Sequence, residues 1–251
     1  MKTSKDIRNY LNKVVKEFKM ILAGNLVGIY LHGSLAMDCY NPKSSDIDLL
    51  IVIKKRLDLK TRRELLKFLV GLPQRYKIEL SVVLRKDINN FKYRTPFQLH
   101  YANEYRQNVL EDPNYLCGPD KDTDLPAHFM MTLHRGKKLY GLSIKKVFRP
   151  IPKKYFIKSL KSDLDWLKER LDDIPVYCIL NICRAICYLR EEKYCSKLEG
   201  GEWALNNLDN EFNDLIKRAL LVYRGKNNFT RLDKKELRRF IDYAEIEMDK
   251  Y

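Results

Sequence analysis

Two carboxylates are the residues of this sequence best placed to do chemistry. Asp46 and Asp48 are separated by one residue at the start of an apolar segment that reads Asp-Ile-Asp-Leu-Leu-Ile-Val-Ile. Because side chains alternate along a strand, both carboxylates fall on the same face. Burying two such groups side by side is costly unless a cation neutralises them, and carboxylate oxygens are ligands that suit Mg²⁺. The spacing therefore predicts a magnesium site at the start of this strand.

A glycine-serine pair precedes these carboxylates. Gly33 and Ser34 follow the apolar run 26–32, which is rich in β-forming residues. Glycine lets a phosphate approach the backbone N–H groups closely, and the serine hydroxyl adds another donor. Gly-Ser and Asp-x-Asp are each common alone, where they would be only a turn and a strand end. Their combination between two predicted strands indicates a site for a metal-bound triphosphate.

Glu79 supplies a third carboxylate, within the segment Tyr-Lys-Ile-Glu-Leu-Ser-Val-Val-Leu. Alternation places it on the face opposite Ile78 and Leu80. If this strand pairs beside the strand of Asp46, the three carboxylates converge. Glu79 can then complete a metal site or act as the general base on an attacking hydroxyl. A solvated glutamate on a strand is the alternative interpretation.

The elements that must position these groups follow from hydrophobic periodicity. In the N-terminal part the pattern predicts helices over 7–22 and 59–72 and strands over 26–32, 46–53 and 76–84; residues 125–141 also look helical. Residues 150–154 interrupt both periodicities with two prolines. Helical patterns follow over 155–171, 176–192, 202–222, with a break near 208–209, and 231–250. The predicted fold class is α+β, with a mixed-sheet domain over 1–154 and an all-α helical-bundle domain over 155–251.

The charge is unevenly divided between these two parts. The 251 residues carry 48 Lys and Arg against 33 Asp and Glu, a net charge of +15. Residues 1–154 hold 30 basic and 15 acidic groups, residues 155–251 hold 18 of each, and residues 155–216 hold 8 basic and 12 acidic groups. An excess of this size points first to a polyanion, and nucleic acid is not excluded. The locally acidic stretch, with Glu191, Glu192, Glu199 and Glu202, predicts an acidic wall for a cationic acceptor.

Composition sets further limits. With 45% hydrophobic and 32% charged residues, the chain is expected to bury a core, which argues against a disordered protein. The apolar runs are too short for a membrane span or a signal peptide, and the six cysteines contain no C-x-x-C pair. We expect a reduced, cytoplasmic monomer without a membrane partner. The four histidines lack metal-ligand spacing, so we interpret them as structural or surface residues.

Together, these motifs resemble the DNA polymerase β-like nucleotidyltransferases, and the resemblance is sharpest to the aminoglycoside (aminocyclitol) adenylyltransferases that act on spectinomycin and streptomycin. The matching segments are 28–34, 45–50, 78–82, 97–101 and 196–204. The resemblance implies a catalytic nucleotidyltransferase domain and a helical domain that binds substrate. It also implies transfer of AMP from Mg-ATP, with two Mg²⁺ ions, to one hydroxyl of a small cationic aminocyclitol. Pyrophosphate would leave, and the modified antibiotic would no longer act.

The resemblance also implies roles for individual residues. Asp46 and Asp48 correspond to the catalytic metal ligands, and Glu79 to the catalytic base in contact with the substrate. Further residues have binding roles: Gly33, Ser34 and Ser45 at the ATP phosphates, Lys197 and Tyr223 at the nucleotide from the second domain, and Glu202 at the amines of the drug. We expect Trp203, beside Glu202, to lie in the core.

Two departures from the family pattern bear on the acceptor. Family members that modify these drugs commonly carry Gly-Glu-Trp after the counterpart of 97–101, where this chain reads Ala-Asn-Glu-Tyr over 102–105. An Asp commonly follows the counterpart of Lys197, where this chain has Leu198. Both departures favour spectinomycin over streptomycin and leave another hydroxyl acceptor open. The alternatives are a nucleotidyltransferase acting on RNA or protein, and a non-catalytic nucleotide-binding partner of a toxin–antitoxin type pair.

Overall fold

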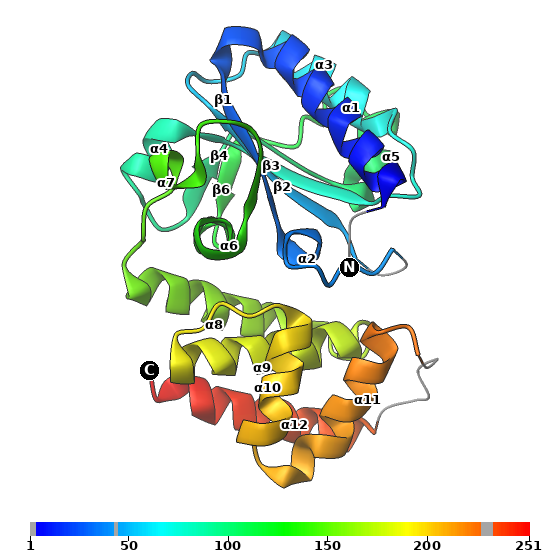
Figure 1. Ribbon diagram of the computed structural model, residues 1–251, viewed down its shortest axis with the longest axis vertical. Coiled ribbons are helices and arrows are strands. Elements are labelled where there is room, and N and C mark those ends of the chain that lie inside the picture. Colours follow the sequence, from blue (N-terminus) through cyan, green and yellow to red (C-terminus); the bar gives the residue numbers. More distant parts are fainter. Residues whose placement is uncertain (1–3, 43–44, 227–232) are drawn as a thin grey trace. The chain divides into compact units, whose positions relative to one another are not determined.

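The computed structural model describes residues 4–42, 45–226 and 233–251, and the chain forms two compact units, residues 1–151 and 152–251 (Figure 1). The first unit is built on a mixed sheet, and the second is entirely helical. The predicted α+β class is therefore confirmed. Among the described residues, no helix is long and apolar enough to cross a membrane.

The central sheet of the first unit has five strands in the order β5-β3-β2-β1-β7. The strands are β1 (Leu26–His32), β2 (Ile47–Ile53), β3 (Ile78–Leu84), β5 (Leu99–Ala102) and β7 (Lys137–Gly141). Strands β2 and β3 run parallel, and the other neighbours are antiparallel. A separate two-stranded ribbon joins β4 (Thr95–Phe97) to β6 (Asp120–Asp122). The three strands predicted from periodicity are confirmed, and they form the middle of the sheet.

Helices cover the two faces of the sheet with different cores. On one face, α1 (Lys5–Leu22) and α3 (Leu59–Val70) lie side by side and pack on residues such as Leu49 and Ile51 (Figure 1). On the other, α6 (Leu125–Arg135) and α7 (Ile144–Val147) pack on Leu50 and Val52. Short helices complete the unit: α2 (Gly33–Ala36), α4 (Arg85–Asn89) and α5 (Arg106–Glu111). By alternation, Asp48 shares the α6 face with Leu50.

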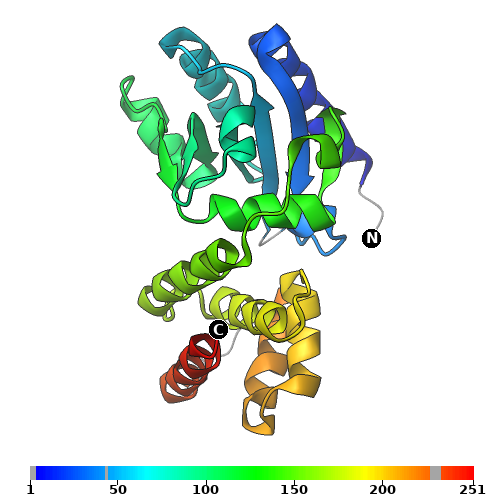
Figure 2. The same cartoon turned by 90° about the vertical axis from the view of Figure 1, so that its left-hand side faces the viewer.

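The helical unit is organised around one buried helix. Its helices are α8 (Lys153–Glu169), α9 (Pro175–Glu191), α10 (Lys197–Asn207), α11 (Asn213–Tyr223) and α12 (Lys234–Asp249). The other four all pack against α9, with α10 and α11 beside each other (Figure 2). Cys178, Cys183 and Cys187 of α9 are fully buried, as expected for thiols that act as small apolar groups.

Two predicted elements differ from the structure. Residues 125–141 are one helix only as far as Arg135; after Gly136 the chain forms β7, an edge strand that pairs with β1. Helix α10 begins at Lys197, well before residue 202, because Ser196 and Glu199 form a capping box at its start. The last helix was predicted from residue 231, which lies outside the described residues; within them it begins at Lys234.

Candidate active site

The predicted catalytic carboxylates lie beside each other across the sheet. Asp48 of β2 pairs in register with Glu79 of the parallel strand β3 and, on its other side, with His32 of β1. Neighbouring strands are about 4.8 Å apart, so these side chains form one row on the α6 face. The strand of Glu79 thus pairs beside that of Asp48, which is the condition for their carboxylates to converge.

Gly33 gives the Asp48 carboxylate its position. The backbone of Gly33 has φ +63°, a left-handed conformation in which glycine is favoured. A Cβ atom built on Gly33 would lie 1.8 Å from Oδ2 of Asp48. The carboxylate therefore occupies the space that any other residue's side chain would fill, and the Gly-Ser turn and the Asp-x-Asp motif are in direct contact.

Two hydroxyls beside this turn are buried without a hydrogen-bond partner among the described residues. They are Oγ of Ser34 and Oη of Tyr40. The pKa of Tyr40 is raised above its usual value, first by burial and then by negative groups that include Asp46 and Asp48. Buried polar groups are normally hydrogen-bonded, so the unsatisfied Ser34 hydroxyl of the Gly-Ser turn points to a polar ligand, whereas Tyr40 belongs to the core under α1 and α3. Tyr40 was not singled out from the sequence.

Ser45 closes the loop that leads into the Asp-x-Asp motif. Its hydroxyl accepts a hydrogen bond from the backbone N–H of Asn41 at 3.1 Å, and its own N–H donates to the Asn41 carbonyl at 2.8 Å. The side chain is buried, with 8% of its surface exposed. This geometry lets Ser45 fix the direction of Asp46, in addition to the predicted contact with phosphate.

Three of the four histidines lie around the carboxylates. The sequence analysis interpreted them as structural or surface residues and did not predict this cluster. His32 is buried, and its ring lies 4.8 Å from that of His128 of α6, between centroids. Nε2 of His128 lies 2.8 Å from Oδ2 of Asp124. Burial opposes protonation of His128, but Asp124, Glu79 and Asp122 outweigh it and raise its pKa to about 10. His128 is therefore an imidazolium at neutral pH.

His100 and Tyr105 border the other side of Glu79. Nδ1 of His100 lies 2.8 Å from Oγ of the buried Ser81, and burial lowers the pKa of His100 below its usual value. The ring of Tyr105 lies 5.9 Å from His100 between centroids. Burial and negative neighbours, which include Glu104 and Glu79, raise the pKa of Tyr105 to about 12. The segment that lacks the family tryptophan thus presents a neutral tyrosine close to Glu79.

The described residues contain no group of three or more Asp, Glu, His or Cys side chains placed to hold a metal ion. Both roles of Glu79 that the sequence suggests, general base and additional metal ligand, therefore stay predictions. Asp46 and Asp48 remain a two-carboxylate pair. Such a pair fits Mg²⁺, because this ion commonly takes one or two protein carboxylates and completes its shell with phosphate oxygens and water.

In the helical unit, the predicted acidic wall is engaged in contacts within the unit. Glu202 accepts a hydrogen bond from Arg224 and pairs with it. The other three carboxylates also have partners: Glu191 with Trp203 Nε1, Glu192 with Lys153 and Glu199 with the backbone of Ser196. Trp203 is only half-buried, so the expectation that it lies in the core is wrong.

The two residues predicted to hold the nucleotide from this unit lie at helix ends. Lys197 is the first residue of α10, and its Nζ lies 3.6 Å from the ring centroid of Tyr177. Tyr223 is the last residue of α11. Tyr177 is 41% exposed and carries no motif by which sequence reasoning could have found it.

Comparisons with known proteins match both units. Residues 11–107 match the family model described as a nucleotidyltransferase domain, and residues 146–247 match that of the aminoglycoside adenylyltransferase C-terminal domain. A spectinomycin 9-adenylyltransferase of Campylobacter jejuni is 26% identical over 223 residues, which cover 86% of this chain and 84% of that protein. An aminoglycoside (3'') (9) adenylyltransferase of Shigella flexneri is 24% identical, covering 98% of this chain and 96% of that protein.

A solved structure shares the fold over nearly the whole chain. The spectinomycin adenyltransferase of Enterococcus faecalis, crystallised with ATP and spectinomycin, has a TM-score of 0.82 at 21% sequence identity. The match covers 96% of this chain and 99% of that one. At this identity the likeness establishes the fold, and the reaction must be argued from the residues.

Proposed function

The chain belongs to the nucleotidyltransferases that carry the C-terminal domain of aminoglycoside adenylyltransferases, and from this membership we propose that it transfers AMP from ATP to a hydroxyl of an aminocyclitol antibiotic. Spectinomycin is the favoured acceptor, pyrophosphate is the second product, and the modified drug no longer acts on the cell. The relatives named spectinomycin 9-adenylyltransferase support this acceptor.

One observation carries the proposal. The carboxylate of Asp48 occupies the space above Gly33 and lies in register with Glu79 on the next strand. A phosphate turn, a metal-binding carboxylate and a candidate base thus lie within one short row. Phosphoryl transfer needs mainly positioning and charge stabilisation, and this row provides both.

Asp46 and Asp48 would hold Mg²⁺ together with the ATP phosphates. The site fits such a ligand, because Gly33 has no side chain to displace the Asp48 carboxylate and the Ser34 hydroxyl is buried without a partner among the described residues. The bound ion would neutralise charge on the phosphates as pyrophosphate leaves. Ser34 and the backbone of Gly33 then donate hydrogen bonds to phosphate oxygens, and Ser45 supports the loop before Asp46.

Glu79 takes the proton from the acceptor hydroxyl. The hydroxyl oxygen forms a bond to the α-phosphorus of ATP, while the bond from that phosphorus to the bridging oxygen breaks and pyrophosphate departs. The proton moves from the attacking oxygen to the Glu79 carboxylate. General-base catalysis of this kind contributes about 10²–10⁴-fold to a rate. Lys197 and Tyr223 of the helical unit complete the binding of the nucleotide, and Glu202 contacts an amine of the drug.

The segment 102–105 favours spectinomycin over streptomycin. Tyr105 lies close enough to Glu79 for the carboxylate to raise its pKa, so its ring borders the place where the attacking hydroxyl must sit. The tryptophan common in the family is absent here, and Leu198 follows Lys197 without a carboxylate. Streptomycin, which carries guanidinium groups, then lacks an anionic partner at that position.

Mass spectrometry tests the proposal directly. Purified protein is incubated with ATP and Mg²⁺ together with spectinomycin or streptomycin, and each drug is examined for the mass of one added AMP. Modified spectinomycin and unmodified streptomycin are expected. Asp48→Asn is the matched control and should yield neither product. Unmodified spectinomycin in the wild-type reaction, with ATP binding intact, would refute the proposed acceptor.

A further inference from the structure

Half of the molecule's positive charge excess lies on one surface of the first unit. This surface, the basic face, consists of the exposed Lys and Arg side chains of α1, of the turn 54–56 and of α3. Its members are Lys5, Arg8, Lys13, Lys16, Lys19, Lys54, Lys55, Arg56, Lys60, Arg63 and Lys67. The same segments contain four acids, Asp6, Glu17, Asp58 and Glu64. Such a density of cations is typical of a surface that binds a polyanion.

Direct contacts join the three segments into one surface. The rings of Phe18 in α1 and Phe68 in α3 meet edge to face, with centroids 6.2 Å apart. Asn25, after α1, accepts hydrogen bonds from the backbone N–H groups of Lys54 and Lys55 at 3.1 and 2.8 Å. The backbones that carry the basic residues therefore keep fixed positions relative to one another.

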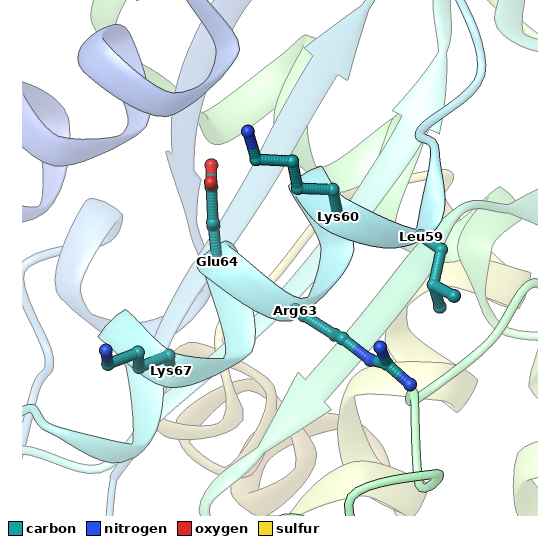
Figure 3. Close-up of a pocket in the computed structure, with 5 residues that line it drawn as sticks. All are labelled: Leu59, Lys60, Arg63, Glu64 and Lys67. Atoms are coloured by element: carbon teal, nitrogen blue, oxygen red, sulfur yellow. The ribbon is translucent and has the colours of Figure 1, made fainter.

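Two of the four acids of these segments have other partners. Asp58 caps α3 by accepting the N–H of Thr61 at 2.7 Å, and Asp6 pairs with Arg75, outside the face, at 3.7 Å. Lys60, Arg63 and Lys67 follow one another at the spacing of a helix turn and line an open hollow of about 420 Å³ with Leu59 and Glu64 (Figure 3). In the part of the chain that the structure describes, these three cations form no ion pair.

The basic face lies on the opposite side of the sheet from the candidate active site. Helices α1 and α3 pack on the face that contains Leu49 and Ile51, whereas Asp48 and Glu79 belong to the α6 face. The cations of the basic face therefore do not serve the triphosphate, and a second ligand bound there leaves the site open.

We propose that the basic face binds double-stranded RNA through its phosphates. Helix α1 alone is about 27 Å long and can follow several phosphates of a duplex. The large apolar side chains exposed on these segments are Met20 and Leu59, and the ring of Tyr140 beside them already has Nζ of Lys19 at 4.7 Å from its centroid. The face therefore offers little aromatic surface for an unstacked base, which favours a paired strand. The exposed amides of Asn9 and Asn12, between the cations of α1, can hydrogen-bond ribose 2'-hydroxyls.

The test uses the full-length chain without ATP or antibiotic, so its outcome is independent of the proposed function. Fluorescence anisotropy measures binding to a labelled 20-base-pair RNA duplex of arbitrary sequence between 50 and 200 mM KCl. The variant is Lys60→Gln, Arg63→Gln, Lys67→Gln. The matched control is Lys145→Gln, Lys146→Gln, Arg149→Gln, which removes the same charge from exposed positions in and beside α7, on the α6 side.

The wild-type chain is expected to bind with a Kd of roughly 10⁻⁴–10⁻⁶ M. The RNA affinity of the basic-face variant should be about tenfold or more lower at 50 mM KCl. The magnitude of its slope of log K against log salt should be smaller by about three, because three phosphate contacts are gone. The control should keep most of its affinity. Circular dichroism of both variants checks that they fold.

Three results would overturn the proposal. Equal losses in the two variants would assign binding to net charge alone. A DNA duplex of the same sequence bound as tightly as RNA would remove the role of the 2'-hydroxyls. Binding of the wild type to vesicles containing phosphatidylserine, but not to RNA, would identify a membrane surface as the ligand.

Discussion

The two units use their acidic residues in opposite ways. The first unit, residues 1–151, carries +13 of the charge excess of +15, yet Asp48 and Glu79 lie beside each other at one end of its sheet, with three histidines around them. The helical unit, residues 152–251, carries a net charge of +2 and is acidic over 155–216, yet many of its acids are paired within the unit. These pairs include Glu202 with Arg224, Glu192 with Lys153, Glu236 with Arg218 and Glu247 with Arg190.

This difference shows that summed charge does not locate an electrostatic site. A carboxylate paired with arginine contributes little field to a ligand, whereas carboxylates in a row on one sheet face act together. We therefore propose that carboxylates of the first unit near Glu79, such as Glu104 and Asp122, add to the contact that Glu202 makes with the cationic acceptor.

The largest effect is expected at Glu79. Replacing Glu79 with Gln keeps the size of the side chain but removes the base, so turnover should fall by about 10²–10⁴-fold while ATP binding measured by calorimetry stays the same. Glu64→Gln, at an exposed glutamate of the same unit, should keep full activity. Turnover of Glu79→Gln near the wild-type rate would show that the row of carboxylates lacks a base.

The ion pairs of the helical unit are expected to matter for stability. Nε and Nη2 of Arg190 donate to Glu247 Oε2 at 3.0 and 2.6 Å, and the Glu247 side chain is only 7% exposed. Arg190→Met leaves Lys250 as the remaining charged partner of that carboxylate and should cost about 1.5–3 kcal/mol of unfolding free energy. Both tryptophans, Trp166 and Trp203, belong to this unit, so urea unfolding followed by tryptophan fluorescence reports on it alone.

The control for this prediction is an exposed pair of the same unit. Lys153→Met removes the partner of Glu192, whose side chain is 65% exposed, and should cost about 0–1 kcal/mol. A loss from Arg190→Met no larger than that from Lys153→Met would show that the ion pairs of the helical unit contribute little to its fold.

In the first unit, a histidine should make stability depend on pH. The pKa of His128 is raised to about 10 in the folded protein, so the fold holds a proton that the unfolded chain, with a pKa near 6.5, releases. The stabilisation of the fold by protonated His128 is complete below pH 6.5 and is lost as pH rises towards 10. His128→Gln should lower the free energy of unfolding by roughly 1.5–3 kcal/mol at pH 6. It should also make the stability nearly independent of pH between 6.5 and 10.

Nuclear magnetic resonance of the imidazole ring measures the His128 pKa directly. The stability of the first unit is measured separately, from urea unfolding monitored through the amide hydrogen exchange of β1 and β2. Asp124→Asn should return the pKa towards 6.5, since Asp124 lies 2.8 Å from Nε2. A ring that titrates near 6.5 in the wild-type protein would contradict this account of the histidine cluster.

The parts of this molecule that were predicted from sequence are those set by local patterns. Strands β1, β2 and β3 follow from apolar runs, and the shared face of Asp48 and Glu79 follows from alternation. The start of α10 could also have been found, because Ser196 and Glu199 have capping-box spacing. Strand β7 could not, because its residues pair only at the edge of the sheet and carry no alternation strong enough to exclude a helix.

The histidine cluster and the paired acids required the tertiary structure. His32, His100 and His128 come from β1, β5 and α6, and no spacing in the sequence brings them together. The composition of residues 155–216 gives the number of carboxylates, but it does not reveal which arginine or lysine each carboxylate pairs with. The domain that seemed suited to a cationic drug is therefore the one whose acids have internal partners.

The smallest effect on activity is expected at Glu202. It tests whether an acid that is paired within the helical unit can also bind the drug. The pair with Arg224 is half-exposed and should be worth about 0.2–1 kcal/mol, so removing it barely changes stability. If Glu202 also contacts the drug, Glu202→Gln raises the KM for spectinomycin a few-fold. Arg224→Gln lowers this KM, because the negative charge of Glu202 is then no longer neutralised by an arginine. Steady-state kinetics at low salt measure both. Equal KM values in the two variants and the wild type would restrict Glu202 to its internal pair and leave acceptor recognition to the first unit.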